Sequence, residues 1–214
     1  MLLYYITDRK GFDGNESERR AALLRSIARA AQAGVDYVQL REKDLGIVDC
    51  ELLAREVLHV VRANSATTRL LINTHTDIAL AIGADGVHLP AGSPPASEVR
   101  GEWLDKNDRE PMIGVSAHSF AEVKQAEEDS ASFAVLAPIF EKAEAPVKRI
   151  GLDMLREACL GSRLPVLALG GVNLTNARSC LDAGAVGIAG IRLFQQGDVC
   201  ERVKRLRELS ETNL

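Results

Sequence analysis

This sequence of 214 residues has no excess of positive charge and few aromatic side chains. Lysine and arginine number 26 against 30 acidic residues, giving a net charge of −4 at pH 7, and aromatic residues make up 4% of the chain. A mildly acidic protein has no basic surface field for phosphate backbones or anionic lipids, and so few aromatics cannot form a base-stacking platform. We therefore expect neither nucleic acid nor a membrane as a partner.

Metal-binding cysteine motifs and long apolar runs are also missing. The four cysteines, Cys50, Cys159, Cys180 and Cys200, are widely spaced, form no CxxC pair and lie in helical patterns. This spacing favours buried, reduced thiols over a disulfide framework or a zinc site. No apolar run reaches about 18 residues, and no basic segment followed by an apolar one stands at the start. The sequence thus predicts a soluble, cytoplasmic protein without a structural metal.

What is present is a regular alternation of short apolar segments and amphipathic stretches. The predicted strands are Leu3–Thr7, Tyr37–Leu40, Leu70–Asn73, Gly86–His88, Met112–Val115, Phe133–Ala137, Val166–Leu169 and Val186–Ala189. The predicted helices are Glu16–Ala33, Ile47–Val61, Asp77–Gly83, Ala96–Leu104, Phe120–Asp129, Asp153–Leu160, Thr175–Ala183 and Asp198–Glu211. Eight strand–helix units with continuously apolar strands predict a closed (β/α)₈ TIM barrel. No linker interrupts the pattern, so we expect a single domain over residues 1–214.

The connections between these elements are of two kinds. Ala33-Gly34, Gly83-Ala84 and Ala183-Gly184-Ala185 stand where a helix must turn sharply into the next strand, and glycine tolerates the left-handed conformation that such a turn requires. The longest irregular segment, Glu141–Gly151, follows the sixth strand and is polar. Because loops after the strands lie at the catalytic end of a TIM barrel, this segment is a candidate lid.

The loops after the seventh and eighth strands carry the clearest signal for a ligand. The seventh strand runs into Gly170 and Gly171, and the eighth into Gly190, Ile191 and Arg192. Small residues let a phosphate approach backbone N–H groups, and TIM barrels often bind phosphate at this corner. The alternative is that the two consecutive glycines only form a tight turn. We predict a phosphate site made by these five residues.

Two cations follow the second strand. Arg41 and Lys43 alternate with Glu42, so both can point to the mouth of the barrel and bind the anionic part of a substrate. In the alternative interpretation they form a solvated, salt-bridged turn with Glu42 and Asp44. The residues alone leave both interpretations open.

Polar side chains at the ends of the third, fourth and fifth strands complete the predicted site. Asn73 can orient a substrate heteroatom, although asparagine is also common in turns. His88 is a packed histidine that also lines the site, and with Ser116 it is predicted to contact the substrate. His118 lies on the mouth loop just before a helix. An imidazole with a pKa near 6.5 can take and return a proton at neutral pH, so His118 is the predicted general acid/base.

Seven motifs together resemble the thiamin phosphate synthase/TenI family. They are Tyr5-Ile6-Thr7-Asp8, Gln39-Leu40-Arg41-Glu42-Lys43, Leu71-Ile72-Asn73, Ala84-Asp85-Gly86-Val87-His88-Leu89, Gly114-Val115-Ser116-Ala117-His118-Ser119, Gly170-Gly171-Val172 and Ala183-Gly184-Ala185. The resemblance implies a TIM barrel acting on thiamin precursors, whose synthase members join hydroxymethylpyrimidine pyrophosphate to thiazole phosphate with Mg²⁺. It places Arg41 and Lys43 at the pyrophosphate and Asn73 beside the pyrimidine. The backbone of Gly171, Ile191 and Arg192 would bind the thiazole phosphate.

The sequence departs from the synthase pattern in three loops. Asn73-Thr74-His75 replaces an Asn-Asp-Asp run, Leu89-Pro90-Ala91-Gly92-Ser93 replaces a Gln-Glu-Asp run, and Phe140-Glu141-Lys142-Ala143-Glu144 replaces a Pro-Thr-x-Thr-Lys loop. The first two replacements remove carboxylates that would hold magnesium. The segments after the fourth and sixth strands resemble the TenI branch instead.

These departures predict a TenI-like thiazole tautomerase that needs no metal or other cofactor. His118 matches the histidine proposed as the base in that branch, and the substrate is a thiazole phosphate carboxylate. Two alternatives stay open: thiamin phosphate synthase with Mg²⁺, and a regulatory protein that binds a thiamin precursor without turnover. The sequence also leaves a homo-oligomer open.

Overall fold

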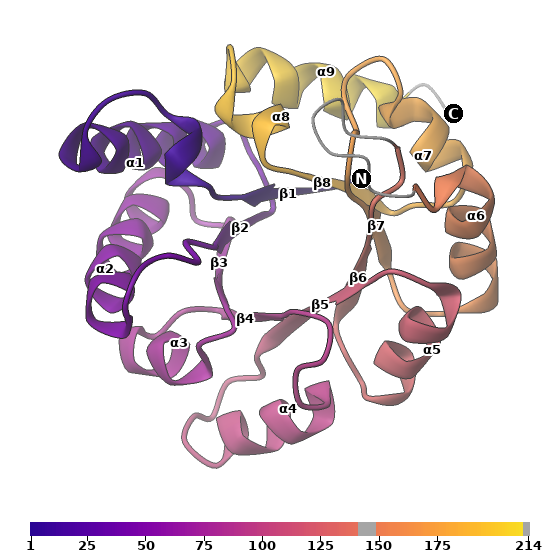
Figure 1. Ribbon diagram of the computed structural model, residues 1–214, viewed down its shortest axis with the longest axis horizontal. Helices are drawn as coiled ribbons and strands as arrows, with labels where there is room; N and C mark the ends of the chain where they lie inside the picture. Colours follow the sequence, from indigo (N-terminus) through magenta and orange to yellow (C-terminus); the bar gives the residue numbers. More distant parts are fainter. Residues whose placement is uncertain (141–148, 212–214) are drawn as a thin grey trace.

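The protein is a closed barrel of eight parallel strands, seen end-on in the computed structural model of Figure 1. The structure describes residues 1–140 and 149–211. The strands are β1 Leu2–Ile6, β2 Tyr37–Leu40, β3 Arg69–Asn73, β4 Gly86–Leu89, β5 Met112–Ala117, β6 Phe133–Leu136, β7 Val166–Ala168 and β8 Gly187–Gly190. The ring closes because β8 pairs with β1, with Leu3 beside Ile188. The predicted TIM barrel is confirmed.

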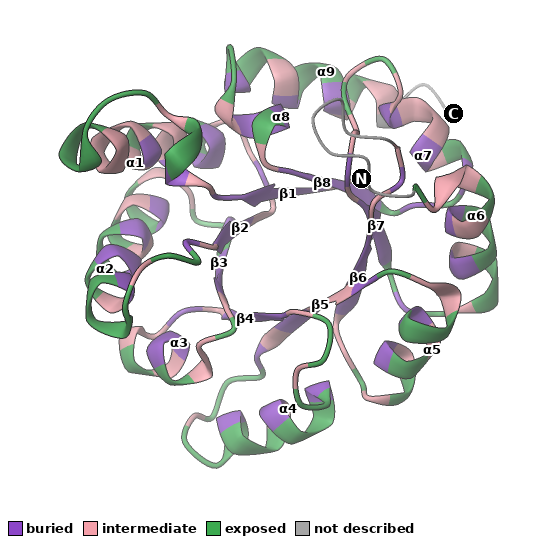
Figure 2. Cartoon of the chain, in the orientation of Figure 1, coloured by how far each residue is buried: buried purple, intermediate pink, exposed green. Residues whose placement is uncertain are grey.

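Helices cover the outside of the ring (Figure 1). They are α1 Glu16–Gln32, α2 Ile47–Asn64, α3 Thr76–Ile82, α4 Ala96–Leu104, α5 Phe120–Glu128, α6 Gly151–Gly161, α7 Ala177–Asp182, α8 Arg192–Gln195 and α9 Val199–Glu211, with a 3₁₀ turn, η1, over Arg9–Gly11. Each buries one apolar stripe on the strands and exposes its other face, as the purple and green bands of Figure 2 show. No helix in the described ranges has an apolar stretch sufficient to cross a membrane.

Two layers of apolar side chains hold the barrel together. The larger layer lies between the strands and the helices, and a smaller cluster fills the inside of the ring. The inner cluster contains Tyr4, Ile6, Leu71, Phe133, Val135, Leu167 and Ala189. The ring of Phe133 stacks on Tyr37 at 5.4 Å between centroids and meets the edge of Tyr4 at the same distance. The inside of the barrel is therefore a packed core that leaves only its ends for ligands.

Local signals in the sequence position the helices. Asn15 and Glu18 form a reciprocal capping box that starts α1, and the Ser119 hydroxyl accepts a hydrogen bond from the backbone of Glu122 to start α5. Gly34 and Gly184, in two of the predicted turns, have positive φ angles of 89° and 101°. Both glycines sit between a helix and a buried strand, where a side chain would strain the backbone.

Several element boundaries differ from the predicted ones by one to three residues, and the larger differences concern short or irregular segments. The short η1 and α8 were not predicted, because elements this short show no helical periodicity. Helix α6 begins at Gly151, inside the segment predicted as a loop, and α7 is shorter than expected. Residues 141–148, which make up most of the predicted lid, lie outside the described residues.

The four cysteines are free thiols, as predicted. Cys50 and Cys180 are buried, as predicted, whereas Cys159 is half-buried and Cys200 is exposed. The prediction of four buried thiols is therefore wrong for Cys200, which lies in the first turn of α9 on the surface of the barrel. Burial raises the pKa of the Cys180 thiol to about 12, so this residue stays protonated at neutral pH.

Candidate active site at the carboxyl ends of the strands

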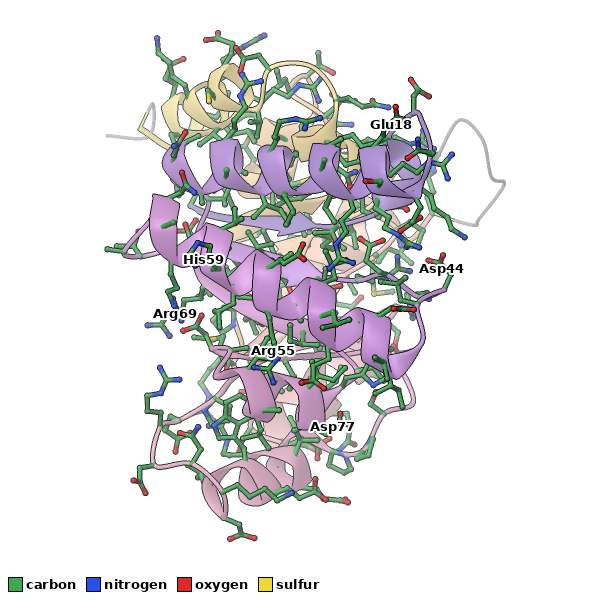
Figure 3. The ribbon with its side chains drawn as sticks, turned by 90° about the vertical axis from the view of Figure 1, so that its left-hand side faces the viewer. Glu18, Asp44, Arg55, His59, Arg69 and Asp77 are labelled. Carbon is green, nitrogen blue, oxygen red and sulfur yellow. The ribbon has the colours of Figure 1, made fainter. Side chains whose placement is uncertain are left out.

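The carboxyl ends of the strands gather at one end of the barrel. In the side view of Figure 3, Asp44 after β2 and Asp77 near the start of α3 lie towards one end, and Arg69 at the start of β3 lies towards the other. All eight strands are parallel, so the loops that follow them share the end marked by Asp44. This end is the mouth of the barrel, where TIM barrels carry their active sites.

A cavity of about 610 Å³ opens between the loops after β7, β8 and β1. Its lining includes all the residues predicted for the phosphate site: Gly170, Gly171, Gly190, Ile191 and Arg192. Asp8, Lys10 and Gln195 also line it. A phosphate-bearing ligand is well below this volume, so the structure brings the predicted residues together around a space that could hold one.

The glycines after β7 are required by their surroundings. Gly170 has φ +94°, and a Cβ built there would lie 2.7 Å from Cα of Pro138. Gly171 has φ +66°, and its carbonyl accepts a hydrogen bond of 3.0 Å from the side-chain amide of Asn176. The two glycines therefore make a tight turn that also lies open to the cavity, so the two interpretations of this motif are compatible.

An amide clasp joins the first and last loops of the barrel. The side chain of Gln195 accepts a hydrogen bond of 3.0 Å from the backbone N–H of Asp8 and donates one of 2.7 Å to its carbonyl. Asp8 is the second residue after β1 and therefore stands at the mouth, a position that could have identified it from sequence. Gln195 had no such signal, because α8 was not predicted.

The acidic residues after β2 bind the β1 loop instead of their neighbouring cations. The guanidinium of Arg9 makes two hydrogen bonds to Asp44, at 2.7 and 2.8 Å, and one of 3.1 Å to Glu42, while Lys10 pairs with Asp44 at 3.1 Å. The Glu42 carboxylate also accepts the Thr7 hydroxyl at 2.7 Å. Burial raises the pKa of Glu42, and the bonds from Thr7 and Arg9 partly offset that rise.

This arrangement removes the salt bridges that the alternative interpretation gave to Arg41 and Lys43. Their proposed salt-bridge partners, Glu42 and Asp44, are taken by Arg9 and Lys10. Within the described ranges neither Arg41 nor Lys43 makes an ion pair. Arg41 is half-buried and Lys43 is exposed. The cations are thus available to an anionic ligand, as the first interpretation requires.

His118 follows β5 directly and is exposed at the mouth. Its Nδ1 lies 2.8 Å from the carbonyl oxygen of Ala137. A carbonyl only accepts hydrogen bonds, so Nδ1 must carry a proton, and in the neutral imidazole Nε2 is then the unprotonated, basic nitrogen. Its backbone N–H donates to the Glu122 carboxylate at 2.9 Å, which fixes the loop. His118 therefore presents one basic nitrogen from an anchored ring.

His88 and Ser116 lie on the inner side of the barrel near its mouth. His88 Nε2 is 2.9 Å from the Ser116 hydroxyl, and His88 Nδ1 is 3.2 Å from the Tyr4 hydroxyl. Burial, together with the positive charge of Arg41, lowers the pKa of His88 to about 3, so this imidazole is neutral at pH 7. His88 is thus packed and hydrogen-bonded, whereas Ser116 stays half-buried beside the mouth.

Asn73 ends β3 beside His88, its register partner on β4. Its side-chain amide donates a 2.9 Å hydrogen bond to the hydroxyl of Thr74, which has a positive φ of 69°. This contact uses one amide proton, and the half-buried side chain keeps its carbonyl oxygen for another partner. The structure places Asn73 at the mouth with the other predicted residues.

The described residues offer no ready-made carboxylate cluster for a magnesium ion. Magnesium prefers carboxylate oxygens in an octahedral arrangement. Residues 1–140 and 149–211 contain no group of three or more His, Cys, Asp or Glu side chains that could hold a metal. Thr74 and His75 follow β3, and Pro90 and Ala91 follow β4, where acids would be needed. Glu42 and Asp44, the acids after β2, are held by Arg9.

Known proteins share both the sequence pattern and the fold. Residues 3–194 match the family model TMP-TENI, described as thiamine monophosphate synthase. The chain belongs to this family. It is 41% identical over 193 residues to a putative thiamine-phosphate synthase 2 of Aquifex aeolicus, covering 90% of this chain and 96% of the relative. It is 35% identical to a thiamine-phosphate synthase of Coprothermobacter proteolyticus, covering 98% and 94% of the two chains.

The fold of the family is seen in a solved structure. A thiamine phosphate pyrophosphorylase from Pyrococcus furiosus superimposes with a TM-score of 0.80 at 28% identity, covering 99% of this chain and 96% of that one. A 3-hexulose-6-phosphate synthase matches with a TM-score of 0.69 at 17% identity, which shows only a shared barrel. The resemblance found in the sequence motifs is confirmed at the level of the family.

Proposed function

We propose that this member of the thiamin phosphate synthase/TenI family is an isomerase that makes a thiazole phosphate carboxylate aromatic by moving a proton. The observation that carries the proposal is His118, an anchored imidazole with a basic Nε2 at the mouth. The cavity of about 610 Å³ at the same mouth would hold the phosphate end of the substrate. The reaction needs these two parts and no metal, which suits a described mouth without a carboxylate cluster.

The proposed reaction removes one proton and adds one, and it needs no other reactant. A base takes a proton from one carbon of the non-aromatic substrate, the double bonds shift, and another carbon receives a proton. Nε2 of His118 would take the first proton, and the resulting imidazolium can return one. The Ala137 carbonyl holds the ring through Nδ1 in both protonation states, so the base keeps its orientation. The backbone around Gly171 and Ile191 would hold the phosphate.

Substitution of His118 tests this role. We expect His118→Ala to lower kcat of thiazole tautomerisation by roughly 10²–10⁴, the usual contribution of a general base. His59→Ala is the matched control, because His59 is exposed on α2, outside the mouth loops. The measurement is the rate at which the aromatic product forms. A His118→Ala enzyme with the rate of the control would remove His118 from the reaction.

The second candidate is the transferase reaction that joins a pyrimidine pyrophosphate to a thiazole phosphate with Mg²⁺. The names of relatives at 35–41% identity favour it, since they are called thiamine-phosphate synthases. Arg41 and Lys43 would then bind the pyrophosphate. Glu141 and Glu144, acids of the loop after β6, lie outside the described residues. Incubation with both substrates, with and without Mg²⁺, decides: metal-dependent formation of thiamin phosphate would replace the isomerase by the transferase.

A further inference from the structure

Four polar side chains form one continuous hydrogen-bonded chain through the inside of the barrel. The Gln39 amide nitrogen lies 2.7 Å from the Tyr4 hydroxyl, which lies 3.2 Å from His88 Nδ1, and His88 Nε2 lies 2.9 Å from the Ser116 hydroxyl. Gln39, Tyr4 and His88 are 1%, 0% and 3% exposed, whereas Ser116 is half-buried. Only the Ser116 end therefore reaches the mouth.

The buried end of this hydrogen-bonded series decides which groups donate and which accept. The Gln39 amide nitrogen can only donate, so the Tyr4 oxygen accepts from it. The single hydroxyl proton of Tyr4 then has one acceptor among the described residues, His88 Nδ1. Leaving that buried proton unpaired would be unfavourable, because it would lose its bond to water and gain none in the protein. Tyr4 must therefore donate to His88, and Nδ1 carries no proton.

The protonation of His88 in turn decides which group donates in the hydrogen bond between His88 and Ser116. A neutral imidazole has one N–H, so the proton of His88 is on Nε2 and is donated to the Ser116 oxygen. The pKa of His88 is about 3, which keeps this neutral form across the physiological range. Ser116 makes no second side-chain hydrogen bond in the described ranges. Its own proton is left for a group at the mouth.

We propose that Gln39 and Tyr4 are positioning residues that lock the tautomer of His88, so that Ser116 acts as a hydrogen-bond donor to an acceptor oxygen of the substrate. Arg41 lies close enough for its charge to act on His88. A donating hydroxyl and a guanidinium at the same mouth suit a carboxylate oxygen. Taking that oxygen as the carboxylate of the thiazole phosphate rests on the proposed function, whereas the direction of the chain does not.

The first test measures the tautomer of His88 in the ligand-free protein. In ¹⁵N-labelled protein, long-range correlation spectra distinguish a protonated Nε2 from a protonated Nδ1. We expect Nε2–H in the wild type and a loss of that single pattern in Tyr4→Phe, which removes only the hydroxyl. Tyr5→Phe is the matched control: Tyr5 is the next residue on β1, and its buried hydroxyl instead contacts Ser26 at 3.1 Å. A wild-type Nδ1–H, or an unchanged tautomer in Tyr4→Phe, overturns the proposal.

The second test uses ligand binding. We expect Ser116→Ala to weaken binding of the thiazole phosphate carboxylate by about ten- to a hundredfold, the range for a hydrogen bond to a charged group. Binding of the same thiazole phosphate without its carboxylate should change little. Equal losses for both ligands would show that Ser116 does not recognise the carboxylate. Because the tautomer is measured without turnover, it still decides the direction of the chain if the isomerase proposal fails.

Discussion

At the scale of single residues, two histidines near the same mouth have opposite properties. His88 is 3% exposed, hydrogen-bonded at both nitrogens and held neutral, whereas His118 is exposed and, among the described residues, bonded through one ring nitrogen. A base must change its charge during turnover, and His88 cannot do so readily inside the barrel. This difference is why we propose proton transfer for His118 and orientation for His88.

Because His88 stays neutral in the folded protein, the free energy of unfolding depends on pH. Its pKa is about 3 in the folded protein against an ordinary 6.5, so between these values the unfolded chain binds a proton that the folded one does not. Its contribution to stability is complete above pH 6.5 and is lost as the pH falls. We expect the free energy of unfolding to drop by about 2–3 kcal/mol from pH 6.5 to about pH 4.5, measured by urea titration.

A matched pair of variants isolates this contribution. His88→Gln keeps a hydrogen-bonding side chain but cannot titrate, so its stability should change less over the same pH range. His59→Gln removes an exposed histidine and should keep the wild-type pH dependence. Equal slopes for all three proteins would mean that His88 does not cause the loss of stability in acid.

At the scale of elements, the turn after β7 illustrates what a motif can and cannot predict. Two consecutive glycines after an apolar strand predicted a phosphate loop, and they do line the cavity. Gly170 also lies close to Pro138 in the loop after β6, and this contact excludes a side chain at position 170. The residues around Gly170 in the sequence do not reveal that contact. Arg9 was missed for the same reason: its partners Glu42 and Asp44 are more than 30 residues away.

Adding a methyl group to this turn tests the close approach. Gly170→Ala places a Cβ 2.7 Å from Pro138 on a backbone with φ +94°. Gly34→Ala is the control, since Gly34 has a similar φ of +89° and open space around its Cβ position. We expect about 1 kcal/mol of destabilisation in the control from backbone strain, and about 1–3 kcal/mol more in Gly170→Ala with weaker phosphate binding. Thermal unfolding and calorimetric titration measure the two effects.

At the scale of the whole molecule, the alternating pattern was enough to predict the architecture. Every predicted strand overlaps an observed one, because strands buried on both faces are apolar throughout. The pairing of β8 with β1 could be expected only from the number of units, since no local feature of Leu3 or Ile188 specifies a partner so distant in the chain. The direction of the Gln39–Ser116 chain also required the structure, because it depends on four strands meeting inside one ring.

Arg207 links the two ends of the described chain. From α9 its guanidinium donates to the Gly34 carbonyl at 2.6 Å and pairs with Asp36 at 2.8 Å, and it also bonds the Met1 carbonyl. We expect Arg207→Ala to lower the free energy of unfolding by about 1–3 kcal/mol, because it removes the guanidinium bonds to the Gly34 and Met1 carbonyls and leaves Asp36 with the Leu3 backbone N–H but without its ion pair. Arg205→Ala on the exposed side of α9 should change it by less than about 0.5 kcal/mol. Equal denaturation midpoints would show that this link adds nothing.

The clasp between Asp8 and Gln195 has a consequence for how the protein is made. One wall of the cavity beside Gly170 and Gly190 comes from the first strand–helix unit and another from the last. On the ribosome, residues 8–11 emerge long before residues 189–196, so a nascent chain has half a pocket for most of its synthesis. A metabolite that binds only the finished pocket stabilises only finished barrels. A ligand of this cavity is therefore expected to stabilise complete barrels and not truncated ones.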